Sequence, residues 1–579
     1  MARKPTLMSG GKILGIWDGH DAGAAVVSEN GKILAAVNEE RFSRKKMHAG
    51  FPYKSVEACL EVSGLSGDEI SDVAFSTTDW AKTTSRLFPK FGQMYYQFRR
   101  RKTDRPAFVN LVRYFKFIST QPARPKALLR RVNEAHVSGT LRKMGFGKFR
   151  IHAVDHHAAH AATAYFPSGF ADGALCVTLD GIGDGLSGTI NYCEDGRIDR
   201  IAEIPARDSI GIFFEQVTTV LGMRELEDEG KVMSLADYSH KTSNKMAGLF
   251  SVDGLRLRAR LGPIAQYNFL ERLAWRTPPE DFAKMAQDTL EETLLKLFSN
   301  ALRETGAKKV CWAGGVASNI KLNQRIRQEL RPKDWFIFPH MGDGGLAAGA
   351  ALLVAGVPYE RKLSEVYFGP SETKESVLDE LGKRKVFRHA EERRNGWQKS
   401  AAEILGGNDF FFLFQGKMEY GPRALGNRSI IAPASSMEVK NELNLRIKER
   451  NWYQPFCPSI LEGEARRLFT DYDGVPDKFM TMGYSCKASA EKKIAAATHI
   501  DNSARPQMVG KENAEYLELL SEVRRKTGTG AVLNTSFNFH GDPIVCRISE
   551  ALDMMERTGT RHMFAEGVHI ELKAEKGRK

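Results

Sequence analysis

The sequence predicts an α/β protein with an N-terminal part of two similar lobes and a second, C-terminal unit. Two observations predict the first part: a pattern of strand, acidic glycine-rich loop and hairpin occurs twice, and apolar strands alternate with helical patterns around the two copies. The chain then becomes polar and charged around residues 356–395. We therefore predict an N-terminal domain over residues 1–355, a linker over 356–395 and a C-terminal domain over 396–579.

The repeated pattern begins at Lys12 ("KILGIWDGHDAGAAVVSENGKILAAVNEERF") and at Gly173 ("GALCVTLDGIGDGLSGTINYCEDGRIDRIAEI"). In each copy an apolar strand ends in an aspartate, Asp18 or Asp180, and a loop of small residues follows. A second and a third strand are then joined by an Asn-Gly or Asp-Gly dipeptide, which is typical of a β-hairpin. Two such lobes facing each other would bring their acidic loops together in a cleft.

Helical patterns complete the N-terminal part. Residues 55–65 and 283–306 keep apolar spacings of three and four up to a glycine, as expected for helices that end there. Residues 308–326 and 336–356 each predict a strand, a glycine-rich turn and a helix, the second of which is apolar enough to be buried.

The composition bounds the class of protein. Of the 579 residues, 42% are hydrophobic and 27% charged, as in a globular protein. No apolar run reaches the roughly 18 residues of a membrane span, and the basic N-terminus lacks the apolar core of a signal peptide, so we expect a cytoplasmic protein. The seven cysteines are scattered without a CxxC pair, which predicts buried, reduced thiols.

The net charge of +13 comes from one insertion. Residues 82–150 hold eighteen Lys or Arg and two acidic residues, a local balance of +16. Basic residues alternate there with Phe and Tyr at helix-like spacing, which suits anionic lipid headgroups, a phosphorylated acceptor or nucleic acid. The same pattern also fits a solvated helical hairpin whose aromatic residues pack on the core. The two interpretations have equal weight. The hypothesis carried forward is that the insertion binds a negatively charged acceptor, for which membrane association, linkage to lipid and peripheral contact with the inner face of an anionic membrane are open options.

The stretch "VDHHAAHAATAYF" places His156 and His160 one helical turn apart on an alanine-rich surface. Imidazoles at this spacing offer two ligands to a divalent metal, and Asp343 is the best candidate for a carboxylate ligand. The spacing alone favours the alternative, a polar helix start with two partly exposed histidines. No HExxH motif is present, which argues against a zincin protease.

Three glycine-rich loops, "DGIGDG", "WAGGVASN" and "GDGGLAAG", each follow an apolar strand. Backbone N–H groups in such loops bind phosphates, so three of them beside an internal repeat favour nucleotide binding over ordinary tight turns. His20 lies in the first small-residue loop between two aspartates. It is a candidate general base near a substrate hydroxyl, although a lone histidine there is also compatible with an exposed loop.

The C-terminal part contains cations and side-chain amides in runs punctuated by glycine and proline. Guanidinium groups bind phosphate bidentately, so this set suits a small, doubly charged ligand such as an acyl phosphate. Each charge alone is equally consistent with a solvated surface. The residues are Lys417, Arg423, Arg428, Lys448, Arg450, Arg505, Asn534, Asn538 and His540.

Taken together, these stretches resemble the O-carbamoyltransferases of nodulation and antibiotic biosynthesis. The resemblance covers nearly the whole chain apart from the basic insertion. It rests on the motifs "GHDAGAAVV", "EERFSRKK", "HHAAHAATAYF", "LDGIGDG", "EGKVMSLADY", "GGVASN", "MGDGGLAAG", "YGPRALGNRSI", "SARPQ" and "LNTSFN", in this order.

The resemblance implies an N-terminal actin-like ATPase (ASKHA-type) domain, related to the enzymes that place threonylcarbamoyl on tRNA, and a C-terminal YrdC-like domain. It implies that carbamoyl phosphate and ATP react in the C-terminal domain to give carbamoyl-adenylate. The N-terminal domain then transfers the carbamoyl group to an acceptor hydroxyl. A divalent metal, Fe²⁺ in the first place and otherwise Mn²⁺ or Mg²⁺, would bind there against the nucleotide phosphate.

The resemblance also assigns residues. His156, His160 and Asp343 match the metal ligands, His20 matches the base, and Asp180 lies in the matching acidic loop near the metal and acceptor. The residues that would contact the nucleotide are Lys231, Gly314, Gly315 and Asn319, and those that match the carbamoyl phosphate and ATP site are Arg423, Lys448, Arg505 and Asn538.

This chain departs from the family at two positions, where relatives usually carry arginine and it carries Gln454 and His540. The loss of two permanent cations is expected to weaken or redirect use of the donor. Two alternatives to O-carbamoylation stay open: a tRNA threonylcarbamoyl-type transferase and a non-catalytic nucleotide-binding scaffold. Nucleic acid is not an expected partner of the leading function.

Overall fold

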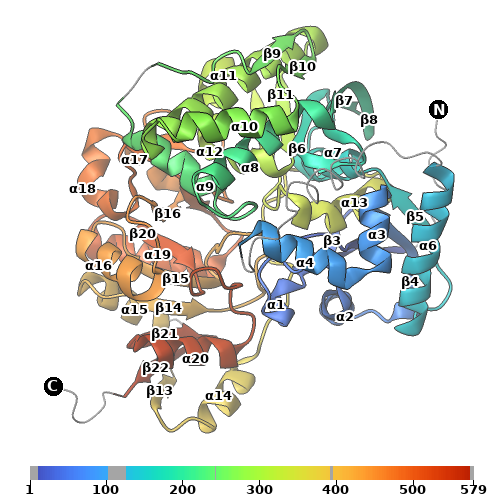
Figure 1. Cartoon of the computed structure of the whole chain (residues 1–579). Helices are drawn as coiled ribbons and strands as arrows, with labels where there is room; N and C mark the ends of the chain where they lie inside the picture. Colours follow the sequence, from blue (N-terminus) through green and yellow to red (C-terminus); the bar gives the residue numbers. More distant parts are fainter. Residues whose placement is uncertain (1–10, 102–125, 241–242, 392–395, 574–579) are drawn as a thin grey trace. The chain divides into compact units, whose positions relative to one another are not determined.

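The computed structural model describes residues 11–101, 126–240, 243–391 and 396–573 (Figure 1). The chain divides into an N-terminal unit, which runs to Ser43 and from Met47 to Leu363, and a C-terminal unit of Arg44–Lys46 and the residues from Ser364 onward.

The N-terminal unit contains two five-stranded sheets of the same topology, in the orders β3-β2-β1-β4-β5 and β8-β7-β6-β11-β12. In each, the first three strands are antiparallel and the last two run parallel to the first strand. The duplicated lobes predicted from the sequence repeat are confirmed. The strands are β1 (Lys12–Trp17), β2 (Gly23–Ser28), β3 (Ile33–Asn38), β4 (Ile70–Ser76), β5 (Arg150–Val154), β6 (Ala174–Gly183), β7 (Leu186–Glu194), β8 (Arg197–Pro205), β11 (Lys309–Ala313) and β12 (Asp334–Ile337).

The predicted hairpins form at the predicted turns. Asp195 and Gly196 connect β7 to β8 with φ angles of 48° and 75°, the pair of positive values that a two-residue type I′ turn needs. Asn30 and Gly31 lie between β2 and β3, and Gly31 has φ 82°. All seven cysteines are free and buried, as predicted.

Two helices made of small residues pack between the sheets. Helix α13 (Leu346–Ala355) contacts β1, β2 and β4 of the first sheet, α7 (His156–Tyr165) contacts β6 and β11 of the second, and the two helices contact each other. A side chain at Gly349 would lie 2.2 Å from the carbonyl oxygen of Ala159, and one at Gly15 would lie 1.9 Å from that of Ala347. Gly349 and Gly15 therefore allow the backbones of these elements to approach closely.

Further helices surround this core. The predicted helices at residues 55–65 and 283–306 are confirmed as α2 and α11, and each ends at a glycine with positive φ. The N-terminal unit contains α1 (Glu40–Ser43), α2 (Tyr53–Ser63), α3 (Trp80–Leu87), α4 (Pro89–Arg99), α6 (Lys126–Lys143), α8 (Ile210–Val220), α9 (Glu229–Leu235), α10 (Pro263–Ala274), α11 (Pro279–Thr305), α12 (Ile320–Leu330) and the hairpin β9 (Phe250–Asp253) and β10 (Arg256–Ala259).

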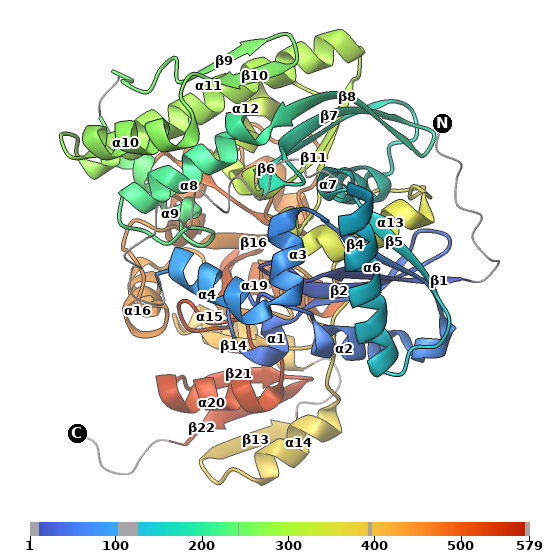
Figure 2. The ribbon, with the colours of Figure 1, turned by 45° about the vertical axis from the view of Figure 1, so that its right-hand side comes forward.

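The basic insertion is mainly helical in its described parts, as its spacing predicts, and residues 102–125 lie outside the described residues. Helix α3 packs against α4 and α6 (Figure 2). Asn133 of α6 accepts a hydrogen bond from Arg86 of α3 (2.6 Å) and donates one to Thr83 (2.8 Å). The insertion is thus anchored to the unit by buried polar contacts.

The C-terminal unit is built on an eight-stranded mixed sheet in the order β13-β22-β21-β14-β15-β20-β16-β19. Strand β14 reads "FFLF", and its alternate side chains enter two separate cores. One core packs under α14, α16 and α20, and the other under α15 and α19. The elements are β13 (Phe387–Glu391), β14 (Phe411–Phe414), β15 (Arg428–Pro433), β16 (Cys457–Leu461), β19 (Gln507–Val509), β20 (Ala531–Ser536), β21 (His562–Ala565), β22 (Val568–Leu572), α14 (Lys374–Gly382), α15 (Trp397–Gly406), α16 (Met437–Glu442), α19 (Ala514–Thr527) and α20 (Ile548–Thr558); short pieces are β17 (Tyr484–Ser485), β18 (Ser503–Ala504), α17 (Ala465–Leu468) and α18 (Glu491–Ile494).

The segment 356–395, expected as a linker, differs from that expectation. It contains α14 and β13, and β13 pairs with β22 at one edge of the sheet. Only Val377 and Leu381 of α14 are buried. The segment lies at the edge of the core and needs few apolar residues, so its sequence is polar like that of a linker. The relation of this unit to YrdC-like domains stays a prediction.

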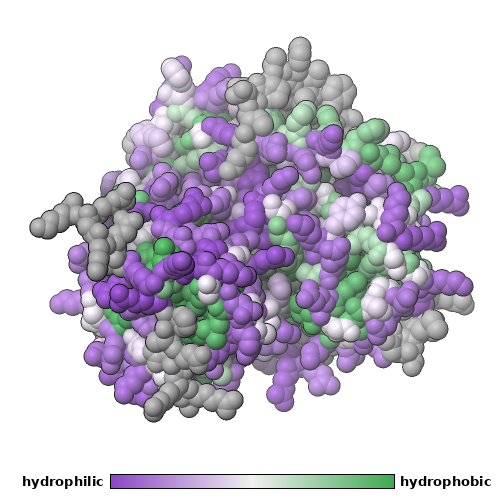
Figure 3. Space-filling model, turned by 90° about the horizontal axis from the view of Figure 1, so that it is seen from below, coloured by the Kyte–Doolittle hydropathy of each residue, from purple (hydrophilic) through white to green (hydrophobic). Residues whose placement is uncertain are grey.

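Among the described residues, no helix combines the length and hydropathy that a membrane span requires. Hydrophilic residues cover much of the face shown in Figure 3, and hydrophobic ones form separate patches between them.

Candidate functional site

The two histidines lie on one face of α7, as their spacing predicts. The helix begins at His156, and the side chain of Asp155 caps it by accepting the N–H of Ala158 at 2.9 Å. His156 and His160 are 1% and 0% exposed, so the expectation of a partly exposed pair is wrong. His157 points elsewhere and its Nδ1 bonds the hydroxyl of Thr178 at 2.9 Å.

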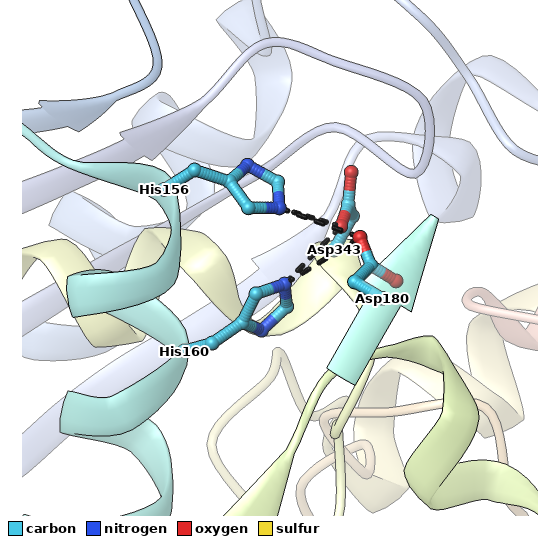
Figure 4. A group of neighbouring side chains, drawn as sticks. All are labelled: His156, His160, Asp180 and Asp343. Carbon is cyan, nitrogen blue, oxygen red and sulfur yellow. Dashed lines mark hydrogen bonds and ion pairs between the residues drawn. The ribbon is translucent and has the colours of Figure 1, made fainter. Parts of the chain in front are cut away.

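Two carboxylates face this pair (Figure 4). The Nε2 atoms of His156 and His160 lie 3.6 and 3.4 Å from Oδ1 of Asp343. The same atoms lie 3.4 and 3.8 Å from Oδ2 of Asp180, which belongs to strand β6 rather than to the loop after it. We call these four residues the histidine–aspartate cluster. The structure brings together the three predicted ligands and adds Asp180.

The cluster fits a divalent metal ion. One ligand atom from each of the four residues lies within 4.8 Å of all the others. Both ring nitrogens of His160 and Oδ1 of Asp343 are buried and have no hydrogen-bond partner among the described residues. Burial opposes protonation of His156, but Asp343 and Asp180 outweigh it and raise its pKa to about 9. The carboxylates therefore favour a positive charge here, and two nitrogen and two oxygen donors suit iron, manganese or zinc.

His20 extends the cluster toward a cavity of about 220 Å³. Its Nδ1 lies 3.5 Å from Oδ2 of Asp343, so this carboxylate faces the histidine pair with one oxygen and His20 with the other. The ring packs near that of Tyr96, with centroids 5.2 Å apart, and burial lowers the pKa of His20. Asp18, Asp180, His156 and Asp343 line the same cavity, as expected for converging acidic loops.

The glycine loop after β11 orients Asp180. Gly314 has φ 100°, and a side chain there would lie 2.0 Å from the carbonyl oxygen of Leu179, so only glycine fits. The N–H of Gly315 donates to Oδ1 of Asp180 at 2.8 Å. This bond holds Asp180 with its other oxygen toward the histidines.

Asn319 and Lys231 were also predicted to contact a nucleotide, and both have partners within the chain. Asn319 caps α12 by accepting from Leu322, and its amide pairs with that of Gln287 at 2.9 and 3.0 Å. Lys231 forms an ion pair with Asp228 at 2.9 Å. Neither Asn319 nor Lys231 lines the cavity, so their contact with a nucleotide stays a prediction.

The structure also shows contacts that the sequence analysis missed. Asp18 binds Lys82 and Arg86 of α3 at 2.6 and 2.8 Å. Further along the insertion, Arg99 pairs with both Glu215 and Glu225, and Arg100 with Glu227. The partners are up to 127 residues apart in sequence, and no spacing pattern signals such pairs. The inward-facing cations of the insertion are neutralised.

A second set of predicted residues gathers in the C-terminal unit. Arg423, Lys448, Arg450 and Arg505, which we call the cationic cluster, have no carboxylate within 4.0 Å among the described residues. Burial lowers the pKa of Arg423 to about 9, with repulsion by Arg505 adding to it, and burial likewise lowers that of Arg450 to about 10. Uncompensated cations at one place indicate an anion site.

The neighbours of the cationic cluster fix its geometry. The ammonium group of Lys448 donates to the backbone oxygen and to Oδ1 of Asn538 at 3.0 and 2.9 Å, and burial lowers its pKa. Arg505 donates from two nitrogens to the sulfur of Cys457 at 3.1 and 2.9 Å. Of the two departures from the family, Gln454 has a buried Oε1 without a hydrogen-bond partner in the described part of the chain, whereas His540 is exposed.

Comparison with known families agrees with the motifs. The models "Carbamoyltransferase N-terminus" and "Carbamoyltransferase C-terminus" match residues 12–352 and 402–571. The uncharacterized protein MJ1058 of Methanocaldococcus jannaschii is 30% identical over 97% of this chain and 100% of its own length. Nodulation protein NolNO of Sinorhizobium fredii is 31% identical over 92% of this chain and 76% of its own length. The resemblance inferred from the motifs is confirmed.

Among solved structures, full-length HypF in the phosphate- and nucleotide-bound form covers 60% of this chain and 46% of its own at 13% identity. Its TM-score of 0.36 is too low to support a statement about chemistry.

Proposed function

This chain belongs to the carbamoyltransferase family and is therefore a transferase enzyme, and from that premise we propose a reaction in two steps. The C-terminal unit makes carbamoyl-adenylate from carbamoyl phosphate and ATP. The N-terminal unit transfers the carbamoyl group to a hydroxyl of a small-molecule, sugar or lipid-linked acceptor. The observation that carries this proposal is Asp343, one oxygen of which faces the histidine pair while the other faces His20, at the edge of one cavity. Family membership leaves the non-catalytic scaffold without support.

The first step belongs to the cationic cluster. Arg423, Lys448, Arg450 and Arg505 offer positive charge to the phosphate groups of both substrates, and Asn538 holds the Lys448 ammonium group in place. Forming carbamoyl-adenylate from carbamoyl phosphate and ATP consumes one water and releases one phosphate and one diphosphate. Binding of these anions would offset the mutual repulsion of the cations.

In the second step the acceptor oxygen attacks the carbamoyl carbon, and the bond from this carbon to the AMP oxygen breaks. The hydroxyl proton passes to His20, whose Nδ1 faces Asp343 and whose Nε2 is left for the acceptor. Asp343 stabilises the resulting imidazolium. The products are the carbamate ester and AMP, and the proton on His20 is then released to solvent, which restores the base.

His156, His160, Asp343 and Asp180 would hold a divalent metal. The two imidazole ligands favour Fe²⁺ over Mg²⁺, and the two carboxylates also suit Mn²⁺. When bound, the metal supplies Lewis-acid stabilisation of negative charge on the nucleotide phosphate. Gly314 and Gly315 position Asp180, and we propose that Lys231 and Asn319 contact the nucleotide only after exchanging their present partners.

We also propose that the outer face of α4 contacts an anionic membrane. The inward cations of the insertion are paired, but Phe88, Phe91 and Met94 are 63%, 54% and 61% exposed on this outer face beside the exposed Lys90. Exposed aromatic residues with unpaired lysine suit lipid headgroups. Phe91→Ser should weaken co-sedimentation with anionic liposomes, whereas Trp275→Ser, which alters a 90% exposed residue elsewhere, should not. Equal binding to neutral and anionic liposomes would contradict this proposal.

The function is tested with labelled carbamoyl phosphate, ATP and a cell extract as the source of acceptor. We expect phosphate, diphosphate and AMP in equal amounts and label on a hydroxyl compound. Absence of ATP-dependent phosphate release by the pure protein would overturn the first step. Label on added tRNA would instead identify the tRNA-modifying alternative.

A further inference from the structure

A second group of metal-type ligands lies in the C-terminal unit, on the hairpin of β21 and β22 (Figure 1). His562 pairs across the hairpin with Glu571, and Phe564 pairs with His569. Because alternate side chains of a strand share a face, all four of these side chains lie on one face of the hairpin. This face also carries Phe564 into the core under α15 and α19.

The ligand atoms have the spacing of a coordination shell. Nδ1 of His562 lies 3.2 Å from Nε2 of His569 and 3.5 Å from Oε1 of Glu571, and the three ligand atoms lie within 4.8 Å of one another. In a tetrahedral zinc site with bonds of about 2.1 Å, neighbouring ligand atoms are about 3.4 Å apart. Two nitrogens and one carboxylate oxygen are borderline donors of the kind that zinc prefers.

Neighbouring side chains fix the two rings. The His569 ring stacks on Phe564, with centroids 4.5 Å apart and planes 16° apart. Nε2 of His562 faces Oδ2 of Asp409 at 3.9 Å, on the side away from the other two ligands. A carboxylate at this position favours the tautomer with its proton on Nε2 and leaves the lone pair of Nδ1 for a metal.

The site is accessible to an ion from solution. The side chains of His562 and Glu571 are 9% and 39% exposed, so the buried imidazole anchors a site that opens at the carboxylate. A fourth position can be taken by water. A proton on Nδ1 of His562 that is shared with His569 and Glu571 would also explain the distances of 3.2 and 3.5 Å. Direct measurement of bound zinc distinguishes the two explanations.

We propose that His562, His569 and Glu571 bind one divalent cation of the zinc type, separate from the metal of the histidine–aspartate cluster, and that it ties β21 to β22. This site does not depend on the proposed carbamoyl transfer. The full chain, stripped with a chelator and reloaded with Zn²⁺, should contain two equivalents of zinc. His569→Gln should lose one equivalent, as should Glu571→Gln. Zinc should raise the melting temperature of the C-terminal unit by about 2–4 °C, and His569→Gln should abolish this shift.

The two sites are separated by measuring zinc in a His156→Gln/His160→Gln background. One equivalent should remain in that background and disappear when His569→Gln is added. His136→Gln, a histidine of α6 outside both groups, is the control and should keep both equivalents. Each metal-free variant should melt at the temperature of the metal-free wild type, which shows that it is folded. If His569→Gln and Glu571→Gln then bind as much zinc as the wild type, the proposal is overturned. Loss of carbamoyl transfer with normal zinc at the hairpin would affect only the proposed function.

Discussion

The histidine–aspartate cluster is a largely buried group of ionisable residues, and the cationic cluster combines the buried Lys448 with three half-buried arginines. The first cluster favours a positively charged ligand, and the second favours a negatively charged one. In the first, two carboxylates face two imidazoles, and the pKa of His156 is raised to about 9. In the second, cations repel one another without a carboxylate partner, and the pKa of Arg423 falls to about 9. The difference teaches that each cluster is electrostatically incomplete without its ligand, a cation in one case and an anion in the other.

The basic insertion is a third group of charges, and it differs from the cationic cluster because its inward-facing cations have carboxylate partners. It has the highest local positive charge in the sequence, yet Lys82 and Arg86 are neutralised by Asp18. The cationic cluster lies in a part of the chain with no such excess, and its charges are uncompensated. Missing partners in space, rather than net charge along the sequence, therefore mark an anion site.

The largest expected effect is on stability and concerns Asp18, which neutralises Lys82 and Arg86. Asp18→Asn leaves Lys82 and Arg86 buried without their counter-charge and should lower the free energy of unfolding by about 3–5 kcal/mol. Urea unfolding near pH 7 measures it. Asp172→Asn, which removes a 75% exposed partner of Lys309, is the matched control and should cost under about 1 kcal/mol.

The pH dependence of this effect has a defined sign. Burial alone would raise the pKa of Asp18, but Arg86 and Lys82 outweigh it and hold this pKa well below its usual range. The stabilisation is therefore complete above the unfolded-state pKa of about 3.9 and is lost as the pH falls toward the lowered folded-state value. The difference between wild type and Asp18→Asn should shrink below about pH 4; a constant difference would contradict the ion-pair explanation.

The next largest effect is on carbamoyl transfer and concerns the histidine–aspartate cluster. His160→Ala removes a ligand and should lower acceptor carbamoylation by at least about 100-fold while phosphate release from carbamoyl phosphate is kept. Metal content should fall in parallel. His157→Gln is the control, since this neighbour bonds Thr178 and faces away from the cluster. Equal loss of transfer in both variants would indicate damage to α7 rather than loss of a ligand.

A smaller effect with an unusual sign is expected at the cationic cluster. Arg423→Gln removes one of two half-buried cations that repel each other, so it should raise the free energy of unfolding by about 1 kcal/mol. The same variant should slow phosphate release about tenfold, because a phosphate contact is lost. Thermal unfolding and a phosphate assay measure the two. If Arg423→Gln is instead less stable than the wild type, the guanidinium of Arg423 makes favourable interactions in the folded chain. The proposed difference between Arg423 and Asp18 would then be wrong.

The smallest effect is expected at the departure from the family pattern. Gln454→Arg adds a permanent cation where Oε1 of Gln454 is buried without a partner. It should lower the KM for carbamoyl phosphate about threefold to tenfold and slightly reduce stability without the donor. Steady-state kinetics measure it. A higher KM would mean that Gln454 itself contacts the donor.

Local patterns predicted much of this molecule. The Asp195–Gly196 turn follows from the φ preferences of two residues, and the shared face of His156 and His160 follows from helical periodicity. Both depend on a few neighbouring positions, so the sequence determines them directly. The choice of Asp343 as a ligand came from the resemblance to a family together with the sequence of its loop, and the structure places it beside the histidines.

What could not be predicted depends on distant parts of the chain. The pairing of Asp18 with Lys82 and Arg86 is set by how α3 docks on the first lobe, which no spacing reveals. Asn319 was expected at a nucleotide, but its amide bonds Gln287 of another helix. Strand β13 was assigned to a linker because an edge strand buries little and keeps a polar sequence.

The central claim is that donor activation and carbamoyl transfer are separate chemistries at two clusters, one that suits an anion and one that suits a cation. It is tested most directly by supplying ready-made carbamoyl-adenylate to wild type, Arg505→Ala and His160→Ala and measuring the carbamoylated acceptor. We predict that Arg505→Ala, inactive with carbamoyl phosphate, transfers at the wild-type rate, whereas His160→Ala stays inactive. Wild-type transfer by His160→Ala, or none by Arg505→Ala, would contradict the account.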